Sequence, residues 1–195
     1  MPFMEPRHRK TVRHLDLPYH AHELTFSTYR RAPVMLRPGV PEVVLEAIAR
    51  VSERGLARIL AFVLMPEHLH LLLMPTARDG VPVSVASILI AVKRPSSFRI
   101  KSLLACAEPR LFRDLMVQER PGKTAFRFWQ EGGGYDRNLT SADAVRSSIE
   151  YIHANPVRRG LCQHPSEWVW SSWRQWHEET PGMAAWMPSV TRGVL

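Results

Sequence analysis

The chain has 195 residues, a hydrophobic fraction of 45%, a net charge of +8 and a pI near 10.2. This length suits one domain with a terminal extension, and the hydrophobic fraction argues against general disorder. The longest apolar run is broken by Pro66, Glu67 and two histidines, which argues against a membrane span, and the absence of a secretory signal pattern together with only two cysteines favours a cytoplasmic protein.

The first half of the chain alternates strands with one helix. Residues 22–29 alternate well enough to predict a strand, and a proline-rich loop follows it. From Pro41 apolar residues recur at helical spacing until Gly55, which is placed to end a helix. Residues 57–65 and 68–74 predict two strands. Because only two residues join them, these strands should be antiparallel.

The second half adds helices and a last strand. Residues 83–107 have a helical apolar pattern, with a second piece after Pro95. We expect residues 108–127 to be irregular and basic, and residues 128–135 (FWQEGGGY) to form a strand that closes on a glycine-rich bend. A further helix should begin after a cap at Thr140 or Ser141 and end at Asn155, the residue before a proline.

The order strand, helix, strand, strand, helix, strand is that of a ferredoxin-like βαββαβ domain. We therefore predict an α+β fold, with an antiparallel sheet, helices on one face and one more helix near the C-terminus. The predicted organisation is a basic extension (1–20), one domain (21–156) and a C-terminal tail (157–195) that holds most of the tryptophans. These tryptophans should pack the tail onto the domain, although stacking on nucleic-acid bases is an alternative.

Two histidines interrupt the apolar strand expected at residues 68–74. His68 and His70 share a parity, so both imidazoles leave the same face of the sheet while Leu69 points the other way. Two imidazoles side by side form half of a metal site, and a third ligand should come from elsewhere in the fold. Glu67 is one candidate, but it points away from the pair if the strand is regular. An incidental His-x-His pair is the plainer interpretation.

A second informative stretch is SSIEYIHANPVRRGL, residues 147–161. Tyr151 and Asn155 are spaced i, i+4 on the expected helix, so a hydroxyl nucleophile and an amide ligand would lie one turn apart on one face. A phenolate is reached far more easily than an alkoxide, which suits attack on a phosphodiester. The alternative is that Tyr151 is a core residue beside Ile149 and Ile152. His153 lies off this face and is assigned to packing or DNA contact.

Together these residues carry a family resemblance. PEHLH inside a hydrophobic strand, followed some 80 residues later by EYIHANPVRRGL and the tail SEWVWSSW, resembles the single-tyrosine HUH transposases, and within them the REP-associated tyrosine transposase branch. The resemblance spans roughly residues 20–175. His-x-His alone is weak, but its combination with Tyr-Ile-x-x-Asn-Pro-Val-Arg in this order is strong. Residues 118–134 do not match the family pattern, which leaves the path of the DNA open.

The resemblance implies a ferredoxin-like fold and a transposase that nicks and rejoins single-stranded or hairpin DNA through a 5′-phosphotyrosine intermediate. Tyr151 would be the nucleophile on a catalytic C-terminal helix. His68, His70 and Asn155 would hold a divalent metal, Mg²⁺ or Mn²⁺. Members work as monomers or as homodimers that exchange the tyrosine, and the sequence leaves both open.

The basic residues are concentrated in two segments. Residues 1–31 carry six Lys and Arg against three Asp and Glu, and residues 83–127 carry nine against three. This localised excess predicts a polyanionic partner, although a generally basic surface is the plainer reading. The candidate phosphate contacts are Arg7, Arg9, Lys10, Arg13, Lys93, Arg94, Arg99, Lys101, Arg158 and Arg159.

Two other functions stay open at this point. The chain could keep the fold and the basic surface as a catalytically silent, domesticated nucleic-acid-binding protein. It could instead be an unrelated metal-dependent hydrolase that uses His68 and His70 on a small substrate. Nucleic-acid binding weakens steeply with added salt, and this would separate the two.

Overall fold

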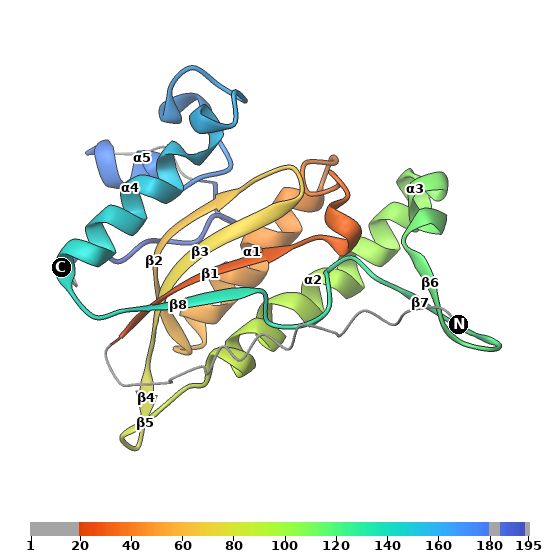
Figure 1. The fold of residues 1–195 in the computed structure, drawn as a ribbon, viewed down its shortest axis with the longest axis horizontal. Helices are drawn as coiled ribbons and strands as arrows, with labels where there is room; N and C mark the ends of the chain where they lie inside the picture. The colour runs from red at the N-terminus through yellow and green to blue at the C-terminus, as the bar shows by residue number, and fades with distance from the viewer. Residues whose placement is uncertain (1–19, 180–183, 194–195) are drawn as a thin grey trace, which may run out of the picture.

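The computed structural model describes residues 20–179 and 184–193 (Figure 1). Arg7, Arg9, Lys10 and Arg13 therefore lie outside the described residues. The elements are, in chain order, β1 (Ala21–Ser27), the 3-10 turn η1 (Tyr29–Arg31), α1 (Val40–Glu53), β2 (Ala57–Leu64), β3 (His68–Pro75), β4 (Ala77–Arg78), β5 (Val81–Pro82), α2 (Val85–Ala107), α3 (Pro109–Asp114), β6 (Met116–Arg120), β7 (Lys123–Phe126), β8 (Tyr135–Leu139), α4 (Ala142–Arg158), the 3-10 turn η2 (Pro165–Glu167) and α5 (Trp173–His177).

A four-stranded antiparallel sheet occupies the centre of the fold, in the order β2-β3-β1-β8. The first and third strands in sequence lie inside, and the second and last form the edges. This is the strand order of the ferredoxin-like arrangement, so the predicted fold class is confirmed. The three residues between β2 and β3 join them as an antiparallel hairpin, as expected from the short link.

One face of the sheet packs against α1 and α2. Leu24 and Phe26 of β1 and Leu69 and Leu71 of β3 enter a single buried cluster with the apolar stripes of both helices. Strand parity explains the selection, because alternate residues of each strand share a face. This layer is the main hydrophobic core.

The opposite face packs against α4 in a smaller cluster, in which Ile149 and Ile152 meet Leu72 of β3. Since His68 and His70 share the parity of Leu72, they lie on the α4 face. The sheet is thus covered on both sides, by two helices on one face and by the C-terminal helix on the other (Figure 1).

The C-terminal tail runs along the outer edge of β2. The backbone N–H of Leu64 donates to the carbonyl of Trp170 at 2.9 Å. The indole N–H groups of Trp168 and Trp176 donate to the carbonyls of Leu64 and Leu60, each at 2.8 Å. The indole N–H groups of these two tryptophans are therefore hydrogen-bonded to the backbone of β2.

The sequence assignment between residues 108 and 135 is wrong in two places. Residues 108–127 are not irregular, because they form α3 and the β6–β7 hairpin. The fourth strand is β8, not residues 128–135. Phe128 and Trp129 are buried at 0% and 7% exposure, but they fill the core from a loop. The apolar character of Phe128 and Trp129 reflects their place in the core, whereas the edge strand β8 is mostly polar and ends at Leu139.

Two helices continue through a proline. α2 is one helix despite Pro95, and α4 does not end at Asn155 but passes through Pro156. The stop comes at Gly160, which has a positive φ of 67°. Leu161 N–H donates back to the carbonyl of Pro156, the bond of a Schellman cap. A proline costs a helix one hydrogen bond, and here the packing of α4 on the sheet outweighs that loss.

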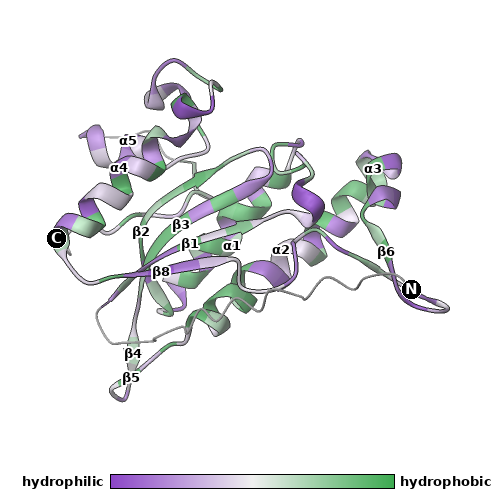
Figure 2. Ribbon diagram, in the orientation of Figure 1, coloured by the Kyte–Doolittle hydropathy of each residue, from purple (hydrophilic) through white to green (hydrophobic). Residues whose placement is uncertain are grey.

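Hydropathy follows this architecture. Figure 2 shows an apolar β2 and a hydrophilic β8 at the two edges of the same sheet. Among the described residues, no helix has both the length and the apolar character that a membrane crossing requires.

Candidate active site

The two histidines of β3 converge at their outer nitrogens. His68 Nε2 and His70 Nε2 lie 3.1 Å apart, and the two rings stand nearly perpendicular at 86°. Both side chains are buried, with 6% of each residue exposed. Two ligand nitrogens at right angles around a cation, each roughly 2.1 Å from it, would be roughly 3.0 Å apart. The spacing therefore fits adjacent positions of an octahedral ion.

The inner nitrogens of both rings are held by protein groups. His68 Nδ1 lies 3.0 Å from Oε1 of Glu67, and His70 Nδ1 lies 2.7 Å from the hydroxyl of Thr25. A carboxylate can only accept, so His68 carries its proton on Nδ1 and presents a lone pair at Nε2. Such partners fix the orientation and tautomer of metal-binding histidines.

Glu67 is the centre of a small ionic network. Besides His68, its Oε1 accepts from Arg31 at 3.0 Å and from Arg159 at 2.9 Å. Burial acts to raise the pKa of Glu67, but the hydrogen bond from Arg159 and the charges of His68 and Arg159 outweigh it and lower the pKa. The carboxylate sits behind the ring of His68, on the side away from Nε2. It is therefore placed to orient the ring of His68, and it does not face the point where the two Nε2 atoms meet.

Burial favours the neutral form of both imidazoles. Desolvation, and then the proximity of His68, lower the pKa of His70 to about 3. Desolvation also lowers the pKa of His68, against the opposing pull of Glu67. Neutral imidazole is the form that binds a metal.

Tyr151 of α4 lies beside this pair. Its ring meets the ring of His70 edge to face, with the centroids 5.8 Å apart, and the guanidinium of Arg158 lies 5.0 Å from its centroid. Tyr151 is 39% exposed, whereas its neighbours Ile149 and Ile152 are 6% and 0% exposed. The isoleucines belong to the core, and the tyrosine is displayed at the surface.

Asn155 lies one helical turn beyond Tyr151 and is 7% exposed. Its amide nitrogen donates to the carbonyl of Tyr151 at 3.4 Å, which leaves the amide oxygen as the group free to act as a ligand. Within the part of the chain that the structure describes, no group of three or more His, Cys, Asp or Glu is arranged to hold a metal. A third protein ligand would therefore have to be a residue of another type, such as an amide.

An open cavity of about 520 Å³ lies between the sheet and α4 at this point. It is lined by Glu23, Thr25, His70, Tyr135, Arg137, Ser147 and Tyr151. Sequence reasoning missed the two residues from β8, Tyr135 and Arg137, because it placed the last strand too early. The one arginine of this lining, Arg137, is paired with Glu23 of the same lining at 2.7 Å.

The predicted phosphate contacts differ in how free they are. Lys93 donates to the carbonyl of Gly132 at 2.8 Å, and Arg99 is bound to Glu46, so both are engaged within the fold. Arg94 and Lys101 are exposed. Arg158 stacks on Tyr151 and Arg159 is bound to Glu67, which places these two next to the candidate site.

His153 lies inside the packing between α4 and the tail. Its Nε2 is 2.9 Å from the hydroxyl of Ser172, and only 3% of the residue is exposed. Burial, and then the charge of His177, lower the pKa of His153 to about 3. It is a buried neutral group and not a DNA contact.

This burial predicts an acid sensitivity. The unfolded chain takes up a proton on His153 below about pH 6.5, while the folded chain resists protonation, so stability is full above that pH and falls as the pH drops. His153→Gln should make the slope of unfolding free energy against pH shallower by up to about 1.4 kcal/mol per unit between roughly pH 6.5 and 5. Urea denaturation across that range measures it. Identical slopes for the two proteins would contradict the assignment.

Comparison with known proteins places the fold. No family model and no curated protein matches the sequence. The structure is similar to that of a REP-associated tyrosine transposase bound to a REP hairpin, with a TM-score of 0.63, 18% identity, and coverage of 85% of this chain and 84% of the other. A protein from Deinococcus radiodurans R1, provisionally described as a transposase, gives a TM-score of 0.42 at 21% identity over 77% of this chain and 97% of the other.

The chain thus has a fold found in transposases. In particular, it shares the fold of a REP-associated tyrosine transposase, as the sequence resemblance implied.

Proposed function

We propose that this chain is a transposase that nicks and rejoins single-stranded DNA through Tyr151. The observation that carries the proposal is the convergence of His68 Nε2 and His70 Nε2 at 3.1 Å, with the exposed ring of Tyr151 set against His70. The shared fold supports the same assignment.

The chemistry is a transfer of one phosphodiester bond. The phenolic oxygen of Tyr151 bonds to the scissile phosphorus, and the bond from phosphorus to the 3′ oxygen breaks. The 5′ phosphate stays on the tyrosine, and the proton lost by the phenol is balanced by the one that the released 3′ hydroxyl gains. Because the energy of the bond is kept, a 3′ hydroxyl can reverse the step and rejoin the strand.

His68, His70 and Asn155 are the residues that would hold a divalent cation, Mg²⁺ or Mn²⁺. Imidazole is not a preferred ligand of Mg²⁺, so such an ion would be held weakly and would take most of its oxygens from DNA and water. When bound it would polarise the scissile phosphate and offset the charge that develops on it. Glu67 and Thr25 keep the two imidazoles aimed at one point.

The DNA would be hairpin-bearing. The relative that shares the fold is bound to a REP hairpin, and this chain carries cations around its candidate site. Arg158, beside Tyr151, is suited to hold the phosphate that the tyrosine attacks. Since the ring of Tyr151 lies against that of His70 within a single chain, we propose that the tyrosine acts in cis.

The test is a covalent adduct with a labelled single-stranded oligonucleotide, taken from the repeats that flank the gene, in the presence of Mn²⁺. Wild-type protein should give an adduct that resists denaturation, and Tyr151→Phe should give none. Tyr135→Phe is a matched control, because Tyr135 is exposed and lines the same cavity. An adduct that survives Tyr151→Phe would refute the nucleophile.

The same experiment separates the other functions. Tight DNA binding with no adduct, unchanged by a chelator or by His68→Ala, would identify a silent DNA-binding protein. Salt-insensitive turnover of a small substrate would identify a hydrolase.

A further inference from the structure

A second hollow lies along α2, between its middle turns and the segment 124–129. It has a volume of about 540 Å³ and is open to solvent. From α2 it is lined by Lys93, Arg94, Ser97, Phe98 and Lys101, and from the other side by residues 124–129. We call it the α2 groove.

Phe98 is the most unusual residue of the α2 groove. It is 74% exposed, whereas Phe26, Phe62 and Phe128 are among the largest fully or almost fully buried side chains of the fold. Little of the Phe98 ring is buried by the fold, so its face is available to a ligand that lies in the groove. Figure 2 places α2 at the lower side of the sheet, away from α4.

Cations flank this ring along the helix. Arg94 lies four residues before Phe98 and Lys101 three residues after it, so all three share one stripe of α2. Both cations are exposed. Arg127, on the opposite wall, is already paired with Glu119 and Glu131. The exposed cations of the groove, Arg94 and Lys101, therefore lie beside the exposed ring of Phe98.

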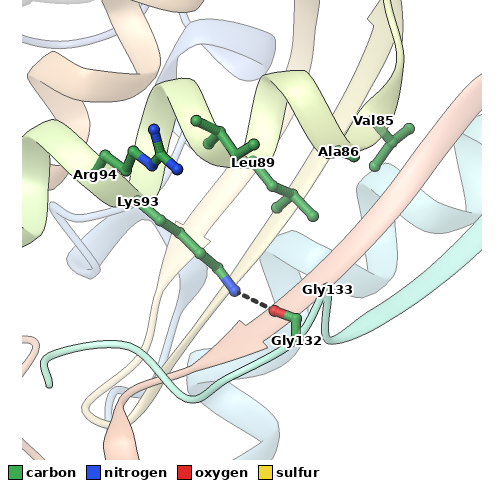
Figure 3. A pocket seen from close by; sticks show the side chains of 8 residues that line it. Val85, Ala86, Leu89, Lys93, Arg94, Gly132 and Gly133 are labelled. Carbon is green, nitrogen blue, oxygen red and sulfur yellow. Dashed lines mark hydrogen bonds between the residues drawn. The ribbon is translucent and has the colours of Figure 1, made fainter.

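The walls of the groove are fixed. The ammonium of Lys93 reaches across from α2 to the carbonyl of Gly132, as Figure 3 shows. It also lies 4.8 Å from the ring centroid of Phe26, and burial lowers its pKa to about 8. The indole of Trp129 donates to the hydroxyl of Ser96 at 3.0 Å. These two hydrogen bonds, from Lys93 to Gly132 and from Trp129 to Ser96, hold the segment 129–132 against α2 and fix the shape of the groove.

The α2 groove is connected to the candidate active site through that loop. An adjoining hollow of about 360 Å³ shares Lys93 and Arg94 with it and is bounded by Gly132 and Gly133 (Figure 3). Two residues further along the chain, Tyr135 lines the cavity that holds Tyr151. The loop 129–135 therefore borders the α2 hollows at one end and the catalytic cavity at the other.

We propose that the α2 groove binds an unpaired segment of the DNA that Tyr151 cuts, with a base stacked on Phe98 and phosphates on Arg94 and Lys101. This rests on the proposed function. A ring flanked by cations is the arrangement that holds single strands, because every base offers a face for stacking and the backbone supplies the negative charge. A duplex hides its base faces, so the ring selects the unpaired strand.

Fluorescence anisotropy with a long labelled oligothymidylate tests the assignment. Phe98→Ala should weaken binding roughly tenfold, as expected for loss of one stacked base. Arg94→Ala should weaken it and reduce its salt dependence. The matched controls are Val81→Ala, an exposed apolar residue of β5, and Arg58→Ala, an exposed cation of the edge strand β2, and neither should change the affinity.

The result also has to be specific for single strands. Binding of a duplex of equal length should change less than twofold on Phe98→Ala. Unchanged affinity for the single strand, or an equal loss for the duplex, would overturn the proposal. Tyr151→Phe should leave this binding intact, so a failed adduct assay and a failed groove are distinguishable outcomes.

Discussion

Replacing Glu67 with alanine should weaken Mn²⁺ binding at the histidine pair by about 10- to 100-fold. Glu67 accepts a hydrogen bond from the Nδ1–H of His68 and is itself held by Arg31 and Arg159. Without it, the ring of His68 can rotate and change tautomer, and the Nε2 atoms of His68 and His70 no longer meet at one point. Calorimetric titration of the purified chain with Mn²⁺ measures the loss.

Glu23→Ala is the matched control for this experiment. Glu23 is also buried on the α4 face of the sheet, and it binds Arg137 at 2.7 Å and Ser148 at 3.1 Å, with no hydrogen bond to either histidine. Its removal should cost stability without a comparable loss of Mn²⁺ affinity. If Glu67→Ala binds Mn²⁺ as tightly as the wild type, the carboxylate does not position His68.

Gly134→Ala should be the most damaging single-methyl change in the loop before β8. Gly134 has a φ of 80°, and a Cβ there would lie 2.2 Å from the carbonyl oxygen of Thr25 and 3.0 Å from Cβ of Phe26. The first contact is with backbone, so either β1 or β8 has to move. We expect a loss of about 3–5 kcal/mol in the free energy of unfolding.

Gly132 provides the comparison within the same loop. Its φ is 88°, but a Cβ there meets nothing within 4 Å. Gly132→Ala should therefore cost only the strain of a left-handed backbone, about 1–2 kcal/mol. Chemical denaturation of both variants measures the difference. Equal losses would mean that the close approach of Gly134 to Thr25 is relaxed at little cost. Because Thr25 also holds His70, Gly134→Ala should disturb the histidine pair as well.

The parts of the fold that were predictable are those in which burial dictates the sequence. The alternation of β1, the apolar runs of β2 and β3 and the stripe of α1 all follow from packing on a core. The β6–β7 hairpin was missed although Pro121 and Gly122 form its turn. Its strands are largely exposed, so no apolar pattern marks them. β8 was missed because an edge strand with one buried apolar residue is stabilised by its backbone pairing to β1.

The candidate site was predictable where parity or helical spacing decides which residues meet. The pairing of His68 with His70 follows from the two-residue period of a strand, and that of Tyr151 with Asn155 from the spacing of one helical turn. The hydrogen-bond partners that hold these residues could be identified only from the three-dimensional fold. Thr25 comes from a neighbouring strand, and Arg31 and Arg159 reach Glu67 from positions 36 and 92 residues away in the sequence. Contacts of that kind leave no local signal.

The tail that runs along β2 has a consequence for handling the protein. An edge strand offers unpaired backbone groups to any other strand, and β2 is apolar over nearly its whole length. Here the backbone of Leu64 and Phe62 is already bonded to Trp170 and Ser172. A shortened chain that ends before Trp168 would expose that edge, and its copies should aggregate by pairing β2 to β2. By bonding to the backbone of β2, the tail keeps that edge strand from pairing with another copy of the chain.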